Sequence, residues 1–222
     1  MDISSIIFDF GGVILDIDPQ LTIKALRDFG FKEWQKLDSP EFYKEVIFPL
    51  EKGLDSPEVF RDKMRNYLQM KLTDEQVNTA WNALLFPLTN ERIRLLEKAK
   101  KHYAIFLLSN SNFIHYQEFL KDLHSNFGYK QFDDLFDKSY FSFELQLIKP
   151  DRKIYDYVLG DQDLDPGQTL FIDDREDNIE GAARTGLKTF HLSNGTRLTD
   201  LFDHTGKLKD PLISGEILTD LV

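Results

Sequence analysis

Short apolar runs alternate with amphipathic stretches over much of the chain. The run from Ser4 to Phe10 is β-branched and aromatic and stops at Gly11-Gly12, which predicts a buried strand that ends in a tight turn. Four further strands are predicted on the same grounds, over residues 104–109, 138–142, 169–173 and 188–192. Helical spacing of apolar residues predicts helices over about 89–101, 112–126, 151–160 and 176–185. This alternation indicates a parallel α/β sheet with crossover helices.

The stretch from Asp18 to Leu88 has a different character. Several short helices are predicted in it, because their start signals recur at Asp18-Pro19, Ser39-Pro40, Ser56-Pro57 and the capping box Thr73–Gln76. The stretch falls between the first predicted strand and the rest of the sheet. We therefore expect a helical cap over residues 17–88, inserted into a core made of residues 1–16 and 89–222.

Composition narrows the possible functions. A chain of 222 residues with 41% hydrophobic residues can bury one core and a small accessory domain. The absence of cysteine excludes thiolate catalysis and cysteine-ligated zinc. A net charge of −11 without a basic stripe argues against nucleic-acid binding. The sequence contains neither a signal-peptide pattern nor an apolar run long enough to span a membrane, so a cytoplasmic protein without a membrane partner is expected.

Polar side chains follow the predicted strands at their carboxyl ends, where ligands gather in a doubly wound sheet. These are Asp9, Ser109, Lys149 and the pair Asp173-Asp174. Neighbouring carboxylates repel one another unless a cation lies between them, and the hard oxygen ligands of Asp9 and Asp174 suit Mg²⁺. Lys149 would neutralise a phosphoryl oxygen, and the Ser109 hydroxyl would bind others. A carboxylate that attacks phosphorus in such a site forms an aspartyl-phosphate.

Each of these features alone is common in turns and on surfaces, so their order along the chain matters. The segments IIFDFGGVILDID, LLSNSN, Lys149-Pro150 and FIDDREDNIEGA resemble the four motifs of the haloacid dehalogenase (HAD) superfamily, in the same order. The resemblance covers essentially the whole chain and implies a Rossmann-like core with a cap of the four-helix-bundle type. The run from Phe171 to Ala182 is similar to the subgroup that contains a bacterial α-D-glucose-1-phosphate phosphatase.

The resemblance assigns the metal and the nucleophile. It implies that Asp9 is the nucleophile and also a Mg²⁺ ligand. Gly11, two residues further on, would bind the ion through its backbone carbonyl. Asp174 would be the other protein carboxylate on Mg²⁺.

The resemblance also assigns the residues around the phosphate. Ser109 would bind the transferring phosphoryl group, with the backbone N–H of Asn110, and Lys149 would supply positive charge. Asp173 and Asn178 would orient the site from its edge, although Asp173 could equally be structural. The implied substrate is a small-molecule phosphate ester, and the oligomeric state is not indicated.

One position departs from the family pattern. Most HAD phosphatases carry Asp-x-Asp, in which the second Asp is an acid and base, but this chain has Asp9-Phe10-Gly11. A phosphatase remains the favoured interpretation. Its substrate would be an ester such as a sugar 1-phosphate, whose leaving group needs little protonation by an acid. A substrate hydroxyl, water or a cap residue would then complete the proton transfers. A 2-haloacid dehalogenase, a non-catalytic relative that binds a phosphometabolite or a partner, and a phosphomutase are the alternatives.

The cap is expected to set specificity by closing over the site and excluding water. Its aromatic residues Phe42, Tyr43, Phe48 and Trp81 have the helical spacing of core residues. His115 lies just beyond the Ser-Asn-Ser-Asn segment, where it either faces the pocket or is a structural histidine of its helix. The sequence offers no basis for choosing the cap residues that touch substrate.

Overall fold

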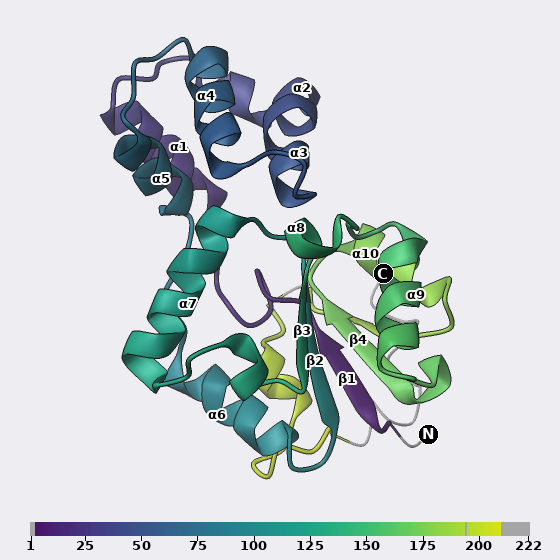
Figure 1. Cartoon of the computed structure of the whole chain (residues 1–222). Helices are drawn as coiled ribbons and strands as arrows, with labels where there is room; N and C mark the ends of the chain where they lie inside the picture. The colour runs from purple at the N-terminus through teal and green to yellow at the C-terminus, as the bar shows by residue number, and fades with distance from the viewer. Residues whose placement is uncertain (1–2, 194, 210–222) are drawn as a thin grey trace.

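The computed structural model describes residues 3–193 and 195–209. Its centre is a five-stranded parallel sheet with the order β3-β2-β1-β4-β5 (Figure 1). The strands are β1 (Ser5–Phe8), β2 (Ala104–Ser109), β3 (Lys138–Phe141), β4 (Thr169–Asp173) and β5 (Lys188–His191). The chain adds β2 and β3 on one side of β1 and then crosses back to add β4 and β5 on the other. This reversal makes the sheet doubly wound and leaves β1 in the middle.

Helices cover both faces of the sheet (Figure 1). They are α6 (Asn90–Ala99), α7 (Phe113–Phe127), α9 (Arg152–Asp161) and α10 (Glu176–Ala183), with the short helix α8 (Ser142–Leu145) after β3. Because successive side chains of a strand point to opposite faces, Ile6 and Phe8 pack with α6 and α7, while Ile7 packs with α9 and α10. All three are fully buried, and each contributes about 1.5–3 kcal/mol on removal from water.

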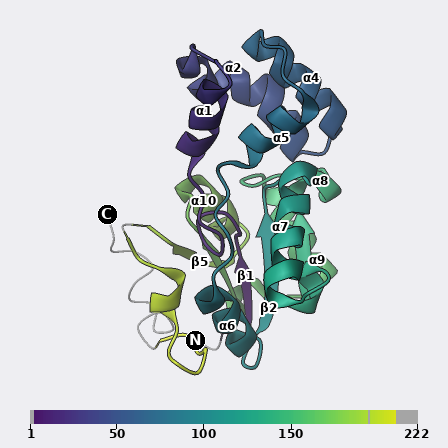
Figure 2. The ribbon, with the colours of Figure 1, turned by 90° about the vertical axis from the view of Figure 1, so that its left-hand side faces the viewer.

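A further group of helices lies above the carboxyl edge of the sheet (Figure 2). It consists of α1 (Pro19–Asp28), α2 (Pro40–Phe42), α3 (Phe48–Glu51), α4 (Pro57–Leu68) and α5 (Asp74–Asn82). A π-helical stretch, Tyr43–Ile47, joins α2 to α3 into one segment, and a 3-10 helix, Trp34–Asp38, lies between α1 and α2. The helices of this group bury an apolar core of their own that includes Leu26, Phe60 and Met64. The sheet therefore carries an inserted helical cap, as expected.

Local sequence explains where the cap helices begin. Asp18, Ser39 and Ser56 each accept a hydrogen bond from the first turn of the following helix, and each precedes a proline. Proline is tolerated there because the first amides of a helix have no partner within it. Thr73 and Gln76 form a reciprocal capping box at α5. All four predicted start signals are confirmed.

Several contacts join the cap to the core, and two of them lie at the linking segments and at α3. The segments that link them pair in an antiparallel bridge between Ile17 and Leu85. At the other end, the Ser142 hydroxyl of α8 donates a 2.6 Å hydrogen bond to the backbone carbonyl of Glu51. Gly53 follows with φ +68°, and a Cβ there would overlap the carbonyl oxygen of Phe143. This close approach requires glycine, and it fixes the end of α3 against the core.

The five strands and the four longer helices around the sheet agree with the predicted ones, with ends that differ by one or two residues, whereas α8 and the 3-10 helices were not predicted. Ser142 is an exception, because it begins α8 instead of ending a strand, and its buried hydroxyl accepts a hydrogen bond from Ser111 N–H. The π-helical stretch has no signature in the apolar spacing. Residues 1–2, 194 and 210–222 of the predicted core lie outside the described residues. Over the range that is described, no helix has the length and apolar character to cross a membrane.

Candidate active site

The carboxyl edge of the sheet gathers the polar residues that follow the strands. Asp9 comes directly after β1, Ser109 ends β2 and Asp173 ends β4. Because β1 pairs with β4 in parallel register, Asp9 comes level with Asp173. Lys149 reaches the same point from the loop between α8 and α9. Residues from four parts of the sequence thus meet at the centre of the sheet.

Lys149 joins the carboxylates through its ammonium group. Its Nζ donates to Asp9 Oδ1 at 2.7 Å, to Asp173 Oδ2 at 2.7 Å and to the Leu108 carbonyl at 2.9 Å. An ammonium has three N–H donors, so all of them have partners. The lysine is buried and is therefore held in one orientation beside Asp9.

The charges at this edge do not balance. Burial raises the pKa of Asp9, with Lys149 opposing the rise and Asp173 adding to it. Burial acts to lower the pKa of Lys149, but the charges of Asp173 and Asp9 outweigh it and raise that pKa. Burial, followed by Asp173, also raises the pKa of Asp174. Three carboxylates facing one ammonium leave an excess of negative charge that a cation can neutralise.

The three carboxylates differ in what they can bind. Each offers an oxygen, and these oxygens lie within 4.8 Å of one another. Asp173 is engaged by Lys149, by the Asn178 side-chain amide on both oxygens at 3.0 Å, and by the Arg175 N–H. Asp9 and Asp174 instead line an open cavity. Asp9 and Asp174 are thus placed to hold a cation, and Asp173 to hold Lys149.

Gly12 allows Asp174 to reach this cavity. Its φ is +80°, and a Cβ at this position would overlap the Asp174 carboxylate. The backbone carbonyl of Asp174 is held separately, by a 3.0 Å hydrogen bond from His191 Nε2. Gly11 also lines the cavity, between Asp9 and the cap. Gly12 therefore makes room for Asp174 as well as forming part of the turn after β1.

Asn110 has a role that the sequence does not reveal. Its Oδ1 accepts from the Lys149 N–H at 2.9 Å, and its Nδ2 donates to the Lys149 carbonyl at 2.9 Å. This paired contact fixes the backbone that carries the lysine. The sequence indicated only the backbone N–H of Asn110, because nothing near that residue points to a partner 39 positions away. Ser109 is buried in the wall of the cavity beneath the cap.

His115 has a hydrogen-bond partner at each ring nitrogen. Its Nε2 lies 3.1 Å from the Trp81 carbonyl and must donate to it, so its Nδ1 accepts from Asn112 Nδ2 at 3.1 Å. The imidazole also stacks on the Trp81 ring, with centroids 5.0 Å apart. Burial lowers the pKa of His115 to about 4, so the ring is neutral at pH 7. The ring nitrogens of His115 are thus satisfied within the protein, and the residue also lines a cavity beneath the cap.

Two adjoining cavities lie beneath the cap. One, of about 700 Å³, is lined by Asp9, Lys149 and Asp174. The other, of about 360 Å³, is lined largely by apolar cap side chains such as Ile23 and Phe42. Six residues line both, namely Gly11, Ile17, Tyr43, Glu51, Asn110 and Arg175. A ligand with a charged end and an organic end can therefore occupy the two cavities together.

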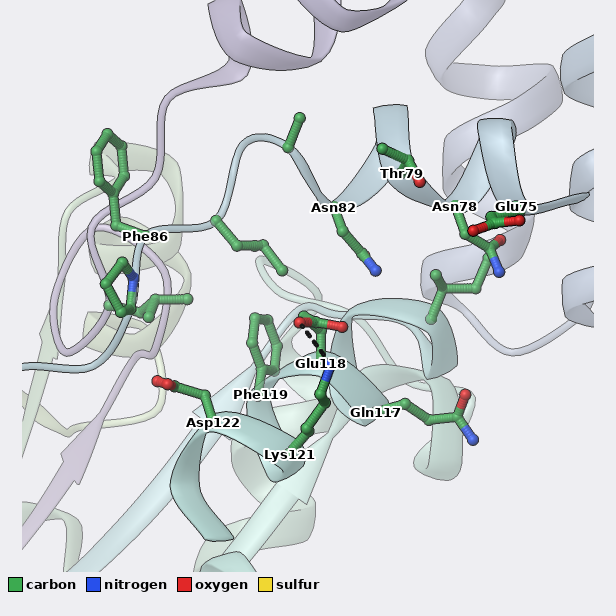
Figure 3. Close-up of a pocket in the computed structure, with 15 residues that line it drawn as sticks. Glu75, Asn78, Thr79, Asn82, Phe86, Gln117, Glu118, Phe119, Lys121 and Asp122 are labelled. Atoms are coloured by element: carbon green, nitrogen blue, oxygen red, sulfur yellow. Dashed lines mark ion pairs between the residues drawn. The ribbon is translucent and has the colours of Figure 1, made fainter. Parts of the chain in front are cut away.

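A third cavity, of about 850 Å³, lies between α5 and α7 and shares Leu85 and Phe119 with the smaller cavity (Figure 3). Figure 3 shows Asn78 and Asn82 of α5 facing the side of α7 that carries an exposed ion pair between Glu118 and Lys121. None of the carboxylates that meet at the edge of the sheet lines it. Volume alone would point to this cavity, but the reactive groups lie in the other two.

Two polar residues near the carboxylates, Glu51 and Arg175, were not predicted from the sequence, and Tyr43 was expected in the cap core but is 44% exposed and lines the cavity. Tyr43 and Glu51 come from the cap, and helical spacing does not show which cap residues face the core. Arg175 directly follows the Asp173-Asp174 pair, and its position beside that pair was a signal that could have been used.

The fold and this arrangement of residues define a class of enzyme. The family model of haloacid dehalogenase-like hydrolases matches residues 3–186. The chain belongs to this family, and it is a hydrolase.

Two curated relatives are phosphatases. The D-ribitol-5-phosphate phosphatase of Bacteroides thetaiotaomicron is 32% identical over 195 residues, which is 87% of this chain and 93% of the relative. A sesquiterpene phosphatase of Aspergillus oryzae is 24% identical over 192 residues, which is 85% of this chain and 89% of the relative.

Solved structures agree with the fold. A HAD family enzyme of Bacteroides thetaiotaomicron, an Asp-to-Ala mutant in complex with magnesium and inorganic phosphate, is 30% identical, with a TM-score of 0.84. The match covers 90% of this chain and 99% of that one. The L-2-haloacid dehalogenase of Xanthobacter autotrophicus is 16% identical, with a TM-score of 0.58 and coverage of 99% and 84%. At that identity the likeness concerns the fold alone.

Proposed function

We propose that this protein is a Mg²⁺-dependent phosphatase that hydrolyses small phosphomonoesters through an aspartyl-phosphate on Asp9. The observation that carries the proposal is the position of Asp9. It is a buried carboxylate at the wall of a cavity, 2.7 Å from a fixed ammonium and close to the carboxylate of Asp174. The phosphatase activity of the curated relatives supports the same chemistry here.

The residues present fit a magnesium ion. Mg²⁺ prefers oxygen ligands and usually keeps several waters, and the carboxylates of Asp9 and Asp174 with the Gly11 carbonyl would hold it. The excess of negative charge at this edge of the sheet also calls for a cation. Bound there, Mg²⁺ supplies the positive charge that polarises a phosphoryl oxygen. The magnesium and phosphate bound by the similar Bacteroides enzyme support this assignment.

The remaining residues act on the phosphate itself. The Asp9 carboxylate attacks phosphorus, the ester P–O bond breaks, and water later cleaves the aspartyl-phosphate to release inorganic phosphate. Lys149 offsets the negative charge that develops on one phosphoryl oxygen. The Ser109 hydroxyl and the Asn110 N–H donate hydrogen bonds to the other phosphoryl oxygens. Asp173 and Asn178 keep Lys149 pointed at the reacting group.

The cap, for which we keep the predicted limits 17–88, would enclose the organic part of the substrate. The smaller cavity, of about 360 Å³, is at the low end of the range for small-molecule pockets. A sugar or sugar-alcohol phosphate suits this size, and the ribitol 5-phosphate of the Bacteroides relative supports that class. A sugar 1-phosphate remains the specific alternative suggested by Gly11.

A phosphate-release assay tests this function. The esters are ribitol 5-phosphate, glucose 1-phosphate and glucose 6-phosphate, each with Mg²⁺ and with EDTA. Asp9→Asn is the blank, because Asn is nearly isosteric and cannot form the acyl-phosphate. We expect metal-dependent release that the variant lacks. Chloride release from 2-haloacids, without release from any ester, would instead identify a dehalogenase.

A further inference from the structure

The proposed phosphatase lacks one group. An alcohol that leaves phosphorus needs a proton, and the water that follows must lose one, so an acid and base is required near the scissile oxygen. Asp9 is committed to the attack on phosphorus, and Asp173 is saturated by Lys149 and Asn178. Gly11, two residues after the nucleophile, has no side chain with which to transfer a proton.

The scissile oxygen can be located from the cavities. It joins the phosphoryl group, beside Asp9, to the organic group beneath the cap, so it lies where the two cavities meet. Six residues line both cavities. Among these six, Glu51 carries the carboxyl group, whereas Asn110 does not titrate and Arg175 stays protonated at all ordinary pH values. Tyr43 is a phenol, and burial raises its pKa to about 12.

The fold holds Glu51 at this junction. It is the last residue of α3, and its carbonyl accepts the 2.6 Å hydrogen bond from Ser142 of the core. Ser142 is itself fully buried, and its hydroxyl accepts a hydrogen bond from the N–H of Ser111, which lies two residues after Ser109. Gly53 packs directly on the Phe143 backbone. The backbone of Glu51 is thus anchored, through Ser142, to the loop that follows Ser109.

The surroundings of Glu51 suit a group that both gives and takes a proton. Burial raises the pKa of Glu51 to about 7, although Arg175, a hydrogen bond with Tyr43, and Lys149 each act to lower it. A catalytic acid and base works best when its pKa lies near the working pH. The side chain is partly buried, so its charge depends on these neighbours.

We propose that Glu51 is the general acid and base of this enzyme, supplied by the cap in place of a side chain at residue 11. This inference rests on the proposed function. As the Asp9 oxygen bonds to phosphorus and the ester P–O bond breaks, the Glu51 carboxyl gives its proton to the leaving oxygen, which departs as an alcohol. The resulting carboxylate then takes a proton from water as that water attacks the aspartyl-phosphate. Inorganic phosphate leaves, Asp9 is freed, and the Glu51 acid is restored.

The test compares two leaving groups in Glu51→Gln. An alkyl phosphate such as ribitol 5-phosphate needs the acid, whereas p-nitrophenyl phosphate does not, because p-nitrophenolate leaves unprotonated. We expect kcat/KM for the alkyl ester to fall by about a hundredfold or more, and kcat/KM for the aryl ester to stay nearly unchanged. The kcat for the aryl ester should nevertheless fall, because the amide in Glu51→Gln cannot take a proton from the water that hydrolyses the aspartyl-phosphate. About one equivalent of p-nitrophenol should therefore appear in a burst before slow turnover.

Two further variants complete the test. Glu41→Gln removes an exposed cap glutamate outside the cavities and should leave both esters unaffected. Glu51→Gln/Gly11→Asp places a carboxyl beside Asp9, where a Cβ meets only Ile17, at 3.4 Å, and should recover alkyl-ester turnover. Equal losses on both esters, or a change in KM alone, would overturn the role of Glu51. Wild-type protein without metal-dependent phosphate release from any ester would overturn the proposed function itself.

Discussion

Lys149 and Asp173 form an ion pair with almost no exposure to solvent, in which the ammonium nitrogen lies 2.7 Å from a carboxylate oxygen. An oxygen of the Asp9 carboxylate lies at the same distance from the ammonium nitrogen. Removing one partner of such a network leaves the others as buried charges without compensation. The lysine therefore stabilises the fold as well as serving the proposed reaction.

Lys149→Met is expected to abolish phosphatase activity and to lower the free energy of unfolding by about 3–5 kcal/mol. The cause is the loss of positive charge between two buried carboxylates. Urea denaturation measures the change. Lys138→Met is the matched control, because Lys138 pairs with Asp133 at a partly exposed site, and it should change stability by less than about 1 kcal/mol. Equal effects of the two variants would refute a special role for the buried lysine.

Asp174→Asn is expected to remove the response to magnesium. A ligand that binds only the folded state at a hundred times its Kd stabilises that state by about 2.7 kcal/mol. Thermal denaturation of the wild type should therefore shift upward with Mg²⁺, and the variant should not shift. Asp156→Asn, on the exposed face of α9, should respond like the wild type. A magnesium shift that survives in Asp174→Asn would place the ion elsewhere.

Gly12→Ala is expected to displace the Asp174 carboxylate, because the new methyl group occupies its position. The concentration of Mg²⁺ needed for half-maximal activity should rise about tenfold or more, which corresponds to about 1.4 kcal/mol of lost binding. Gly30→Ala separates this clash from backbone strain. Gly30 also has a positive φ, of +100°, but no heavy atom lies within 4 Å of a Cβ there. That variant should lose stability while its magnesium requirement stays the same.

His115 is expected to make stability depend on pH. Burial lowers its pKa in the folded protein to about 4, whereas its ordinary value is 6.5. Between these values the unfolded chain binds the proton more readily, so stability is full above pH 6.5 and declines as the pH falls toward 4. The decline from this residue amounts to about 3 kcal/mol at pH 4. Urea denaturation across this range should show a shallower decline for His115→Gln, and identical slopes would contradict the assignment.

The strands and the order of the polar residues at their ends could be predicted, because both depend on local sequence. The polar residue at which an apolar run stops, Asp9 or Ser109, marks the end of the strand. Because the strands are parallel, these ends lie at the same edge of the sheet. The cap helices were predictable for a similar reason, since capping side chains and prolines mark their starts.

Other contacts could not be predicted because they depend on how distant segments pack. The bond from Asn110 to the Lys149 backbone spans 39 positions, and that from Ser142 to Glu51 spans 91. Glu51 itself resembles any helix glutamate until the cap is placed on the core. The proton-transfer group proposed for this enzyme was therefore hidden, whereas its absence at Gly11 was visible in the sequence.

The hydrogen bond from Ser142 to Glu51 has a consequence for how fast substrate and product exchange. Any movement that lifts α3 from the sheet breaks this bond, which contributes about 1 kcal/mol net. That energy makes a lifted cap roughly fivefold rarer than it would otherwise be. The same hydroxyl therefore contributes to how long the closed cap shields the aspartyl-phosphate before the alcohol escapes, and a change at Ser142 is expected to alter turnover without touching the cavity lining.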